Sequence, residues 1–326
     1  MRGWVVRVHA GNSQHHAAQV NTRPRAGGIE RGDAARVLSS LPDNSIQLIV
    51  TSPPYWCFAD YGFAGQIGQS SYDKYVKDLL GVWKHCERLL SPNGKLCINT
   101  PIMPVPKKMN NGRHTRDLKN LNNDIEASIL KHTGLGRFSL YIWQKQTTEK
   151  MFGSYPYPPN IFENNTIEFI SVYVKNGAPQ KLSARVKERS RLSQEEWMDL
   201  TRQVWWIYPE DTKRVGLHPA PFPELLALRL IKMYTFQAVP EEGFPGDVVL
   251  DPFVGSGTTC VAAKMLNRRW IGVDGSKEYC EFATRRIAKT VPYPQVDVRL
   301  RRLSDADRAL QHNLFQDTVP SLHPKN

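Results

Sequence analysis

SIQLIVTSPPYW, residues 45–56, contains an apolar run of mostly β-branched residues that stops at two prolines. The run Ile46–Val50 predicts a buried strand. Because proline has no backbone N–H, Pro53 and Pro54 cannot continue a strand's hydrogen-bond ladder. The strand therefore places a hydroxyl, two peptide units without donors and an aromatic ring at its carboxyl end, which is where open α/β sheets bind ligands.

The tetrad Ser52-Pro53-Pro54-Tyr55 suits a planar base that carries an exocyclic amine. Such an amine can donate hydrogen bonds to the Ser52 hydroxyl and the Pro53 carbonyl while the base stacks on Tyr55. Considered alone, the tetrad is more often a strand that ends in a proline turn. The other motifs of the chain decide between these two interpretations.

A chain of 326 residues with 40% hydrophobic and 23% charged residues can bury a large core, in one domain or two. No run approaches the roughly 18 apolar residues of a membrane span, and the N-terminal apolar stretch is too short for a secretory signal. The net charge of +12 favours a polyanionic partner. Five cysteines without a CxxC pair indicate reduced, cytoplasmic thiols, and we expect neither a metal site nor a disulfide framework.

The first half of the chain predicts alternating strands and helices. Residues 1–28 lack periodicity and predict a loose leader. Residues 61–71 form a loop rich in Gly, Gln and Ser, of a kind that can order over a substrate. An amphipathic helix follows over 71–90, and 138–146 and 166–176 are predicted as an antiparallel strand pair at the edge of a mixed sheet.

Two segments are basic. Residues 101–135 predict either a solvated loop or a loop that contacts phosphates, and residues 178–215 suggest a variable insert that sets specificity. The candidate DNA-binding residues of the two segments are Lys107, Lys108, Arg113, Arg116, Arg185, Lys187, Arg189 and Arg191.

The second informative stretch is DVVLDPFVGSGTTCVAAKML, residues 247–266. An apolar strand leads into Asp251, a Gly-Ser-Gly turn follows, and a helix begins near Thr258. The glycines let the backbone approach a ligand, and the helix N-terminus offers N–H groups to an anion. The next strand ends in Asp274, where a carboxylate suits the two hydroxyls of a ribose.

This turn lacks the Gly-Lys-Ser/Thr of a nucleotide-triphosphate loop and the G-x-G-x-x-G of dehydrogenases. An adenosyl site that binds an amino-acid carboxylate remains, and we expect its ligand to be S-adenosyl-L-methionine. With TSPPYW ahead of DPFVGSGTT, the chain resembles the permuted β group of DNA amino-methyltransferases over about residues 29–290. GDA near the start, GQIG after the tetrad and HPAPFPELLALRLI before the glycine turn add to the resemblance.

The resemblance implies an α/β, Rossmann-like methyltransferase fold with a mostly parallel, seven-stranded sheet and a circularly permuted motif order. The strands that lead to Asp251 and Ser52 should then be neighbours. Along the chain we expect a leader, a catalytic half, a target-recognition insert, the cofactor-binding half of the same domain and a tail, over 1–28, 29–177, 178–215, 216–290 and 291–326.

The resemblance also implies the roles of individual residues. The tetrad would hold the target base and its amine, Asp274 would bind the ribose, and Asp33 would read the adenine amine. The remaining cofactor-binding candidates are His218, Pro219, Phe222, Pro223, Asp251, Phe253, Gly255, Ser256, Gly257, Thr258 and Thr259. Two alternatives stay open, since Asp33 can simply cap a helix and Asp251 can simply brace a turn.

The expected activity is methyl transfer to an exocyclic base amine in double-stranded DNA, with the base flipped out of the duplex. A serine at the first tetrad position resembles the cytosine-N4 subgroup. The alternatives are adenine-N6 transfer, a non-catalytic DNA-binding protein that keeps the fold, and transfer to RNA or a small amine. We expect a prokaryotic, cytoplasmic, nucleoid-associated protein of a restriction–modification system, a monomer or homodimer, with a cognate restriction endonuclease as partner and no membrane contact.

Overall fold

The structure, a computed structural model, describes residues 26–58, 65–106, 109, 116–145, 152–209 and 222–300. Its centre is a nine-stranded sheet, and eight of its strands follow the spatial order β1-β11-β10-β2-β3-β8-β5-β9. In that order the strands are β1 (Gly28–Arg31), β11 (Arg269–Asp274), β10 (Val248–Asp251), β2 (Ile46–Thr51), β3 (Leu90–Pro104), β8 (Ile167–Lys175), β5 (Leu135–Lys145) and β9 (Val204–Ile207). Of these eight, only β8 runs antiparallel to its neighbours.

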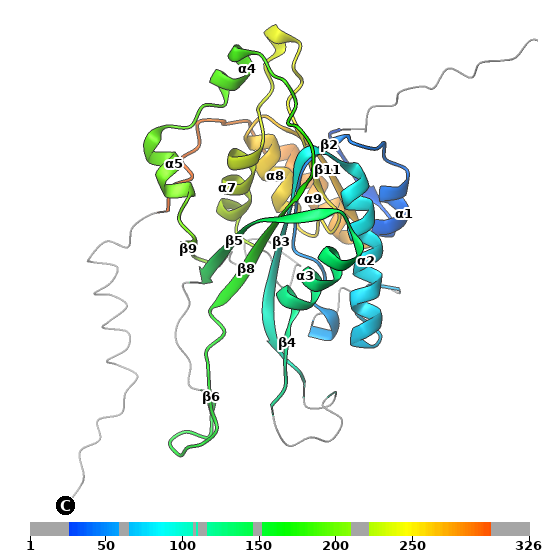
Figure 1. The fold of residues 1–326 in the computed structure, drawn as a ribbon, viewed down its shortest axis with the longest axis vertical. Helices are drawn as coiled ribbons and strands as arrows, with labels where there is room; N and C mark the ends of the chain where they lie inside the picture. Colours follow the sequence, from blue (N-terminus) through cyan, green and yellow to red (C-terminus); the bar gives the residue numbers. More distant parts are fainter. Residues whose placement is uncertain are drawn as a thin grey trace, which may run out of the picture.

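The predicted fold class is confirmed, and the strand count differs from the prediction. The first seven strands of the order correspond to the expected sheet. β9 extends it beyond β5, and β4 (Leu118–Asn120) pairs with the end of β3. The predicted antiparallel pair is β5 and β8, but β9 and not this pair forms the edge. A separate two-stranded hairpin, β6 (Phe152–Gly153) and β7 (Ile161–Phe162), projects from the β5–β8 connection (Figure 1).

Helices cover both faces of the sheet, with α2 and α3 on one side and α7 and α8 on the other (Figure 1). The helices are α1 (Ala34–Ser39), α2 (Tyr72–Leu89), α3 (Leu121–His132), α4 (Ala184–Arg189), α5 (Gln194–Leu200), α7 (Glu224–Tyr234), α8 (Thr258–Met265) and α9 (Lys277–Lys289), with short 3₁₀ turns η1 (Trp56–Phe58) and η3 (Pro240–Glu242). None of the described helices is both long and apolar enough to cross a membrane.

The alternation of side chains along the central strands explains this three-layer arrangement. In β10, Val248 and Leu250 join the core under α1, α2 and α3, whereas Val249 faces the core under α7 and α8. Helix α2 buries one stripe, which includes Tyr75, Leu79 and Trp83, and Ser71 caps its start. Because both faces of the sheet are buried, side chains on both sides of each central strand are apolar. This explains the continuous apolar runs in the sequence.

The permuted chain order is visible in the sheet. β2 and β10 are parallel neighbours with Leu48 opposite Val249, although about 200 residues separate them. The helices that follow these two strands, α2 and α8, lie on opposite faces. The carboxyl ends of β2 and β10 therefore form a topological switch point, where ligands bind in open α/β sheets.

The described residues of the predicted insert, 178–209, are part of this framework. β9 completes the sheet, and the fully buried guanidinium of Arg229 in α7 donates to the Asp199 carboxylate at 2.6 Å. The described start of the tail also packs on this side, where Val298 and Leu300 are buried. The predicted leader falls on residues 1–25, outside the described part of the chain, and on the first residues of the fold, since β1 begins at Gly28.

Candidate active site

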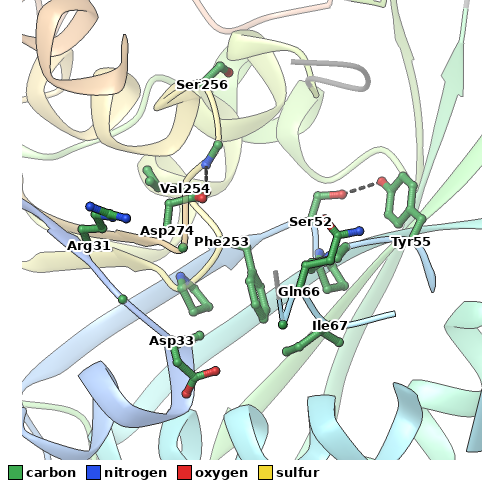
Figure 2. A pocket seen from close by; sticks show the side chains of 18 of the residues that line it. Arg31, Asp33, Ser52, Tyr55, Gln66, Ile67, Phe253, Val254, Ser256 and Asp274 are labelled. Atoms are coloured by element: carbon green, nitrogen blue, oxygen red, sulfur yellow. Dashed lines mark hydrogen bonds between the residues drawn. The ribbon is translucent and has the colours of Figure 1, made fainter. Parts of the chain in front are cut away.

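A cavity of about 460 Å³ opens at the carboxyl ends of β1, β11, β10 and β2 (Figure 2). The predicted site residues that line it are Asp33, Ser52, Pro53, Pro54, Tyr55, Phe222, Phe253, Gly255, Ser256, Thr258 and Asp274. Arg31, Gln66, Ile67 and Val254 also line it; Gln66 and Ile67 belong to the GQIG stretch, but none of the four was predicted as a site residue. The predicted catalytic and cofactor motifs thus share one cavity.

The tetrad leaves β2 at Thr51 and turns sharply into η1. Trp56 has a φ of +39°, in the left-handed region, which reverses the chain after Tyr55. The Tyr75 hydroxyl of α2 donates to the Pro54 carbonyl at 2.8 Å and holds the turn against the helix. Ser52 and Tyr55 join their hydroxyls in a hydrogen bond beside the cavity (Figure 2).

The described end of the glycine-rich loop closes one side of the cavity, with Gln66 and Ile67 facing Ser52 (Figure 2). Gly68 anchors this segment at a φ of +107°. A Cβ at this position would lie 2.7 Å from the Trp56 carbonyl oxygen, so only glycine lets the loop approach the tetrad. Residues 61–64 of the predicted loop lie outside the described residues, and the ordering of the loop over a substrate stays a prediction.

Gly257 lets the second motif turn from β10 into α8. It has a φ of +87°, and a Cβ there would lie 2.9 Å from the Cβ of Ala283 in α9. Gly257 therefore lies behind the cavity, whereas Gly255, Ser256 and Thr258 face it.

The Asp274 side chain links the glycine-rich turn after β10 to the segment that follows β11. Its carboxylate accepts from the backbone N–H groups of Gly255 at 2.9 Å and Ser276 at 2.8 Å. Burial raises the pKa of Asp274, and these N–H donors act in the opposite direction. Just after the neighbouring strand β1, Asp33 caps α1 by accepting from the N–H of Arg36 at 2.9 Å and also lines the cavity. The helix cap and the ligand-facing position are compatible for Asp33.

Asp251 braces the junction between the two motifs. Its side chain accepts from the hydroxyl of Thr51 at 2.7 Å, the N–H of Phe253 at 3.1 Å and the hydroxyl of Thr259 at 2.8 Å. Asp251 and Thr259 are buried and do not line the cavity. These contacts favour the bracing alternative for Asp251, and they give Thr259 the same role.

Pro223 starts α7 next to Phe222 and does not line the cavity. His218 and Pro219 lie outside the described residues. The sequence interpretation missed Arg286 of α9, whose guanidinium donates to the Thr258 hydroxyl at 2.9 Å and pairs with Glu224 at 3.1 Å. An arginine on a helix surface gives no local signal of such a contact.

The chemistry of the cavity fits S-adenosyl-L-methionine. Asp274 offers a carboxylate to sugar hydroxyls, and the Phe253 ring, packed edge-on against Trp83, gives an apolar surface for a planar base. The first turn of α8 offers N–H groups to a carboxylate. The volume is within the usual range for cofactor pockets, roughly 300–1,000 Å³.

The structure separates the predicted DNA-binding residues. Lys107, Lys108 and Arg113 lie outside the described residues. Arg116 lies at the cavity's edge of the sheet, where its guanidinium forms two hydrogen bonds with Glu163 beside the β6–β7 hairpin, at 2.6 and 2.9 Å.

The other four candidates, Arg185, Lys187, Arg189 and Arg191, lie on or just after α4. The segment before α4 is held at the amino ends of the strands, where the Gln180 amide donates to Asp247 directly ahead of β10. Arg189 pairs with Glu241 in the same region, at 3.0 Å. Figure 1 shows α4 at the end of the molecule opposite β4 and β6. These four residues lie at the edge opposite the cavity, because β8 runs antiparallel and returns the chain there, and their recognition role stays a prediction.

Comparison with known proteins places the chain in a family. The profile of the N6_N4_Mtase family, described as DNA methylase, matches residues 46–285 and spans both motifs. The chain belongs to this DNA methylase family. The expected resemblance to DNA amino-methyltransferases is thereby confirmed at the level of the family.

Individual relatives agree with this membership. The chain is 28% identical to the Type II methyltransferase M.MthZI of Methanothermobacter thermautotrophicus, over 82% of this chain and 78% of the relative. It is 29% identical to M.SmaI of Serratia marcescens, over 79% and 89% of the two chains.

Among solved structures, TTHA0409 of Thermus thermophilus, complexed with S-adenosyl-L-methionine, is 34% identical, with a TM-score of 0.65 over 81% of this chain and 94% of that one. The PvuII DNA methyltransferase (cytosine-N4-specific) has a TM-score of 0.58 at 18% identity, over 90% of this chain and 93% of that one, and shows the shared fold.

Proposed function

We propose that this DNA methylase transfers a methyl group from S-adenosyl-L-methionine to the N4 amine of cytosine within one short sequence of duplex DNA. The observation that carries the proposal is the shared cavity, in which Ser52 and Tyr55 of one motif face Phe253 and Thr258 of the other. The order of the motifs and the family membership support it. The names of Type II relatives favour a role in a restriction–modification system.

Bound S-adenosyl-L-methionine supplies an electrophilic methyl group, which is attached to its sulfonium sulfur. Loss of the methyl group converts the sulfonium into a neutral thioether. The target nitrogen gains the methyl group and loses one proton. An exocyclic amine is a poor nucleophile because its lone pair is delocalised into the ring. Hydrogen bonds from the amine to the Ser52 hydroxyl and the Pro53 carbonyl draw the nitrogen toward sp³ geometry, and the cavity walls align it with the methyl carbon. The base must leave the duplex to enter this cavity.

We place the DNA along the carboxyl edge of the sheet, because a flipped base can reach the tetrad only from that side. The β6–β7 hairpin projects at this edge and exposes the rings of Tyr155 and Tyr157. Arg116 links the hairpin to the segment that precedes β4. These features replace α4 as the proposed recognition surface.

Mass spectrometry of nucleosides from methylated duplex DNA tests the target atom. We expect N4-methylcytosine, because Ser52 offers a neutral hydroxyl where adenine-N6 enzymes more often carry an aspartate. The Pro53 carbonyl and the Tyr55 ring do not discriminate between the two bases. N6-methyladenine as the sole product would replace the cytosine assignment by the adenine alternative and leave the cofactor site unaffected.

Asp274→Ala should weaken S-adenosyl-L-methionine binding by about 1–3 kcal/mol, because the cavity loses its charged acceptor. Calorimetry measures the affinity, and thermal unfolding establishes that the variant folds. Asp73→Ala, on the exposed side of α2, is the matched control and should bind the cofactor as the wild type does. Unchanged affinity in folded Asp274→Ala would remove this residue from the cofactor site.

The salt dependence of DNA binding tests the two basic segments separately. If Lys107 contacts a phosphate, Lys107→Gln should flatten the slope of log K against log salt by about 0.9. Arg189→Gln at the opposite edge should leave the slope unchanged. The basic segment over 101–135 would be a solvated surface loop if its variants all kept the wild-type slope. These variants are Lys107→Gln, Lys108→Gln and Arg113→Gln.

A cofactor-binding assay separates the enzyme from the alternative of a non-catalytic DNA-binding protein, which needs no methyl donor. Methylation-sensitive sequencing of DNA from an expressing host would identify the recognition sequence. We further propose a cytoplasmic location at the nucleoid, a monomer or homodimer, and a cognate restriction endonuclease as partner. The bacterial and archaeal sources of the Type II relatives support this context.

A further inference from the structure

A buried polar cluster lies behind the tetrad, between β3, β5 and β8. Its centre is Glu168 of β8, which is 6% exposed. The Tyr55 hydroxyl donates to Glu168 Oε2 at 3.3 Å, and the Asn99 side-chain amide donates to the same oxygen at 2.5 Å. Lys145 Nζ pairs with the other carboxylate oxygen at 2.5 Å. A hydrogen-bonded path therefore runs from this ion pair through Tyr55 to Ser52.

The carboxylate determines the direction of this path. An ionised Glu168 has no proton to donate, so the Tyr55 hydroxyl is the donor in their contact. The Tyr55 oxygen then accepts in its hydrogen bond with Ser52, so the Ser52 proton points toward Tyr55. The lone pairs of Ser52 are left for an incoming N–H group. The backbone carbonyl of Asn99, 3.2 Å from Ser52 Oγ, is the second acceptor within reach of the Ser52 proton.

The orientation of Asn99 indicates that the cluster is not arranged for stability alone. Its amide nitrogen faces Glu168, and its Oδ1 is buried without a hydrogen-bond partner among the described residues. A buried acceptor without a partner costs free energy. The Asn99 side chain thus donates a hydrogen bond to the Glu168 carboxylate, whereas its own Oδ1 accepts none from the described residues.

We propose that Glu168 is a positioning residue that acts through Tyr55 to hold the Ser52 hydroxyl as a hydrogen-bond acceptor for the target amine. This inference rests on the proposed function. The negative charge polarises the Tyr55 and Ser52 hydroxyls in sequence and strengthens Ser52 as an acceptor. The contribution is greatest when the amine nitrogen gains positive charge during methyl transfer, so Glu168 should affect turnover more than binding.

Glu168→Gln tests this role, because the amide keeps the shape and removes the charge. We expect kcat for DNA methylation to fall about 10- to 100-fold, the usual worth of a charge-assisted hydrogen bond. The affinities for S-adenosyl-L-methionine and DNA should change less than twofold. A kcat equal to that of the wild type would refute the role of Glu168, whereas a wild-type protein that methylates no DNA would refute the proposed function itself.

Double variants distinguish positioning from a structural effect. Because Glu168 acts through the Tyr55 hydroxyl, the kcat of Tyr55→Phe/Glu168→Gln should equal that of Tyr55→Phe within about twofold. Independent, multiplicative losses would overturn the inference. Lys145→Gln/Glu168→Gln removes both charges of the ion pair, and its kcat should stay as low as that of Glu168→Gln. Recovery to the wild-type kcat would show that only the unpaired Lys145 charge had mattered, and this too would overturn the inference.

Discussion

Asp251→Ala should destabilise the folded protein by about 3 kcal/mol or more. The side chain is 1% exposed and accepts hydrogen bonds from Thr51, Phe253 and Thr259. Alanine removes a hydrogen-bond acceptor from all three donors, and a buried donor left without a partner costs about 1–3 kcal/mol. The loss should be measured as the free energy of unfolding in denaturant, with Asp73→Ala as the control on an exposed helix face. A change below about 1 kcal/mol would contradict the bracing role.

The pH dependence of stability gives a second test of the same carboxyl. Burial raises the pKa of Asp251 from 3.8 to about 6, and the charge of Asp274 adds to this shift. Between these pH values the folded state retains a proton that the unfolded state has released. The stability contributed by Asp251 therefore falls as pH rises through this window, by up to about 3 kcal/mol.

Asp251→Asn keeps an acceptor oxygen and cannot ionise. We expect it to flatten the decline in unfolding free energy between about pH 4 and 6, a window that follows from the two pKa values. Asp274 has a pKa raised in the same direction, so a smaller slope of the same sign should remain. Equal slopes for Asp251→Asn and the wild type would show that Asp251 does not titrate in this range.

Ser52→Ala should lower kcat about 100-fold, comparable to the loss of one preorganised hydrogen-bonding group at a reacting centre. The Ser52 hydroxyl matters most as the amine nitrogen becomes tetrahedral, so DNA affinity should change little. Single-turnover kinetics with excess enzyme measure the chemical step, and a binding titration measures the affinity.

Ser39→Ala, at the exposed end of α1, makes the same chemical change away from the cavity and should leave both values unchanged. If Ser52→Ala loses DNA affinity in proportion to its turnover, the hydroxyl serves in binding and not in the transition state. If turnover is retained, the target amine is held by other groups.

Local signals account for the parts of the site that the sequence predicted. Pro53 and Pro54 end a strand whatever surrounds them, because they lack the N–H that a ladder requires. Gly257 marks a turn with a positive φ, and Asp274 is the last residue of a mostly apolar strand. Such features depend on a few neighbouring residues and can be recognised from the chain alone.

The pairing of β2 with β10 was expected only from the family resemblance, since no local pattern relates Leu48 to Val249. The recognition role predicted for the insert came from the composition of that stretch, including its basic residues. Charge along a chain does not indicate on which edge of a sheet it will lie. Because β8 runs antiparallel, the chain that follows it lies at the end opposite the cavity. There Arg185 and Arg189 pair with glutamates.

The sequence by itself determined the two motifs, their order and the chemistry that their residue types allow, because proline, glycine and the residues at strand ends act through the local backbone. The tertiary structure decided which side chains meet. In the sequence, Glu168 is a single acidic residue within an apolar strand. Only the alignment of β3, β5 and β8 places it next to Asn99, Lys145 and Tyr55. Contacts between distant segments depend on strand register and on burial in the shared core, and neither is encoded in any short stretch of the chain.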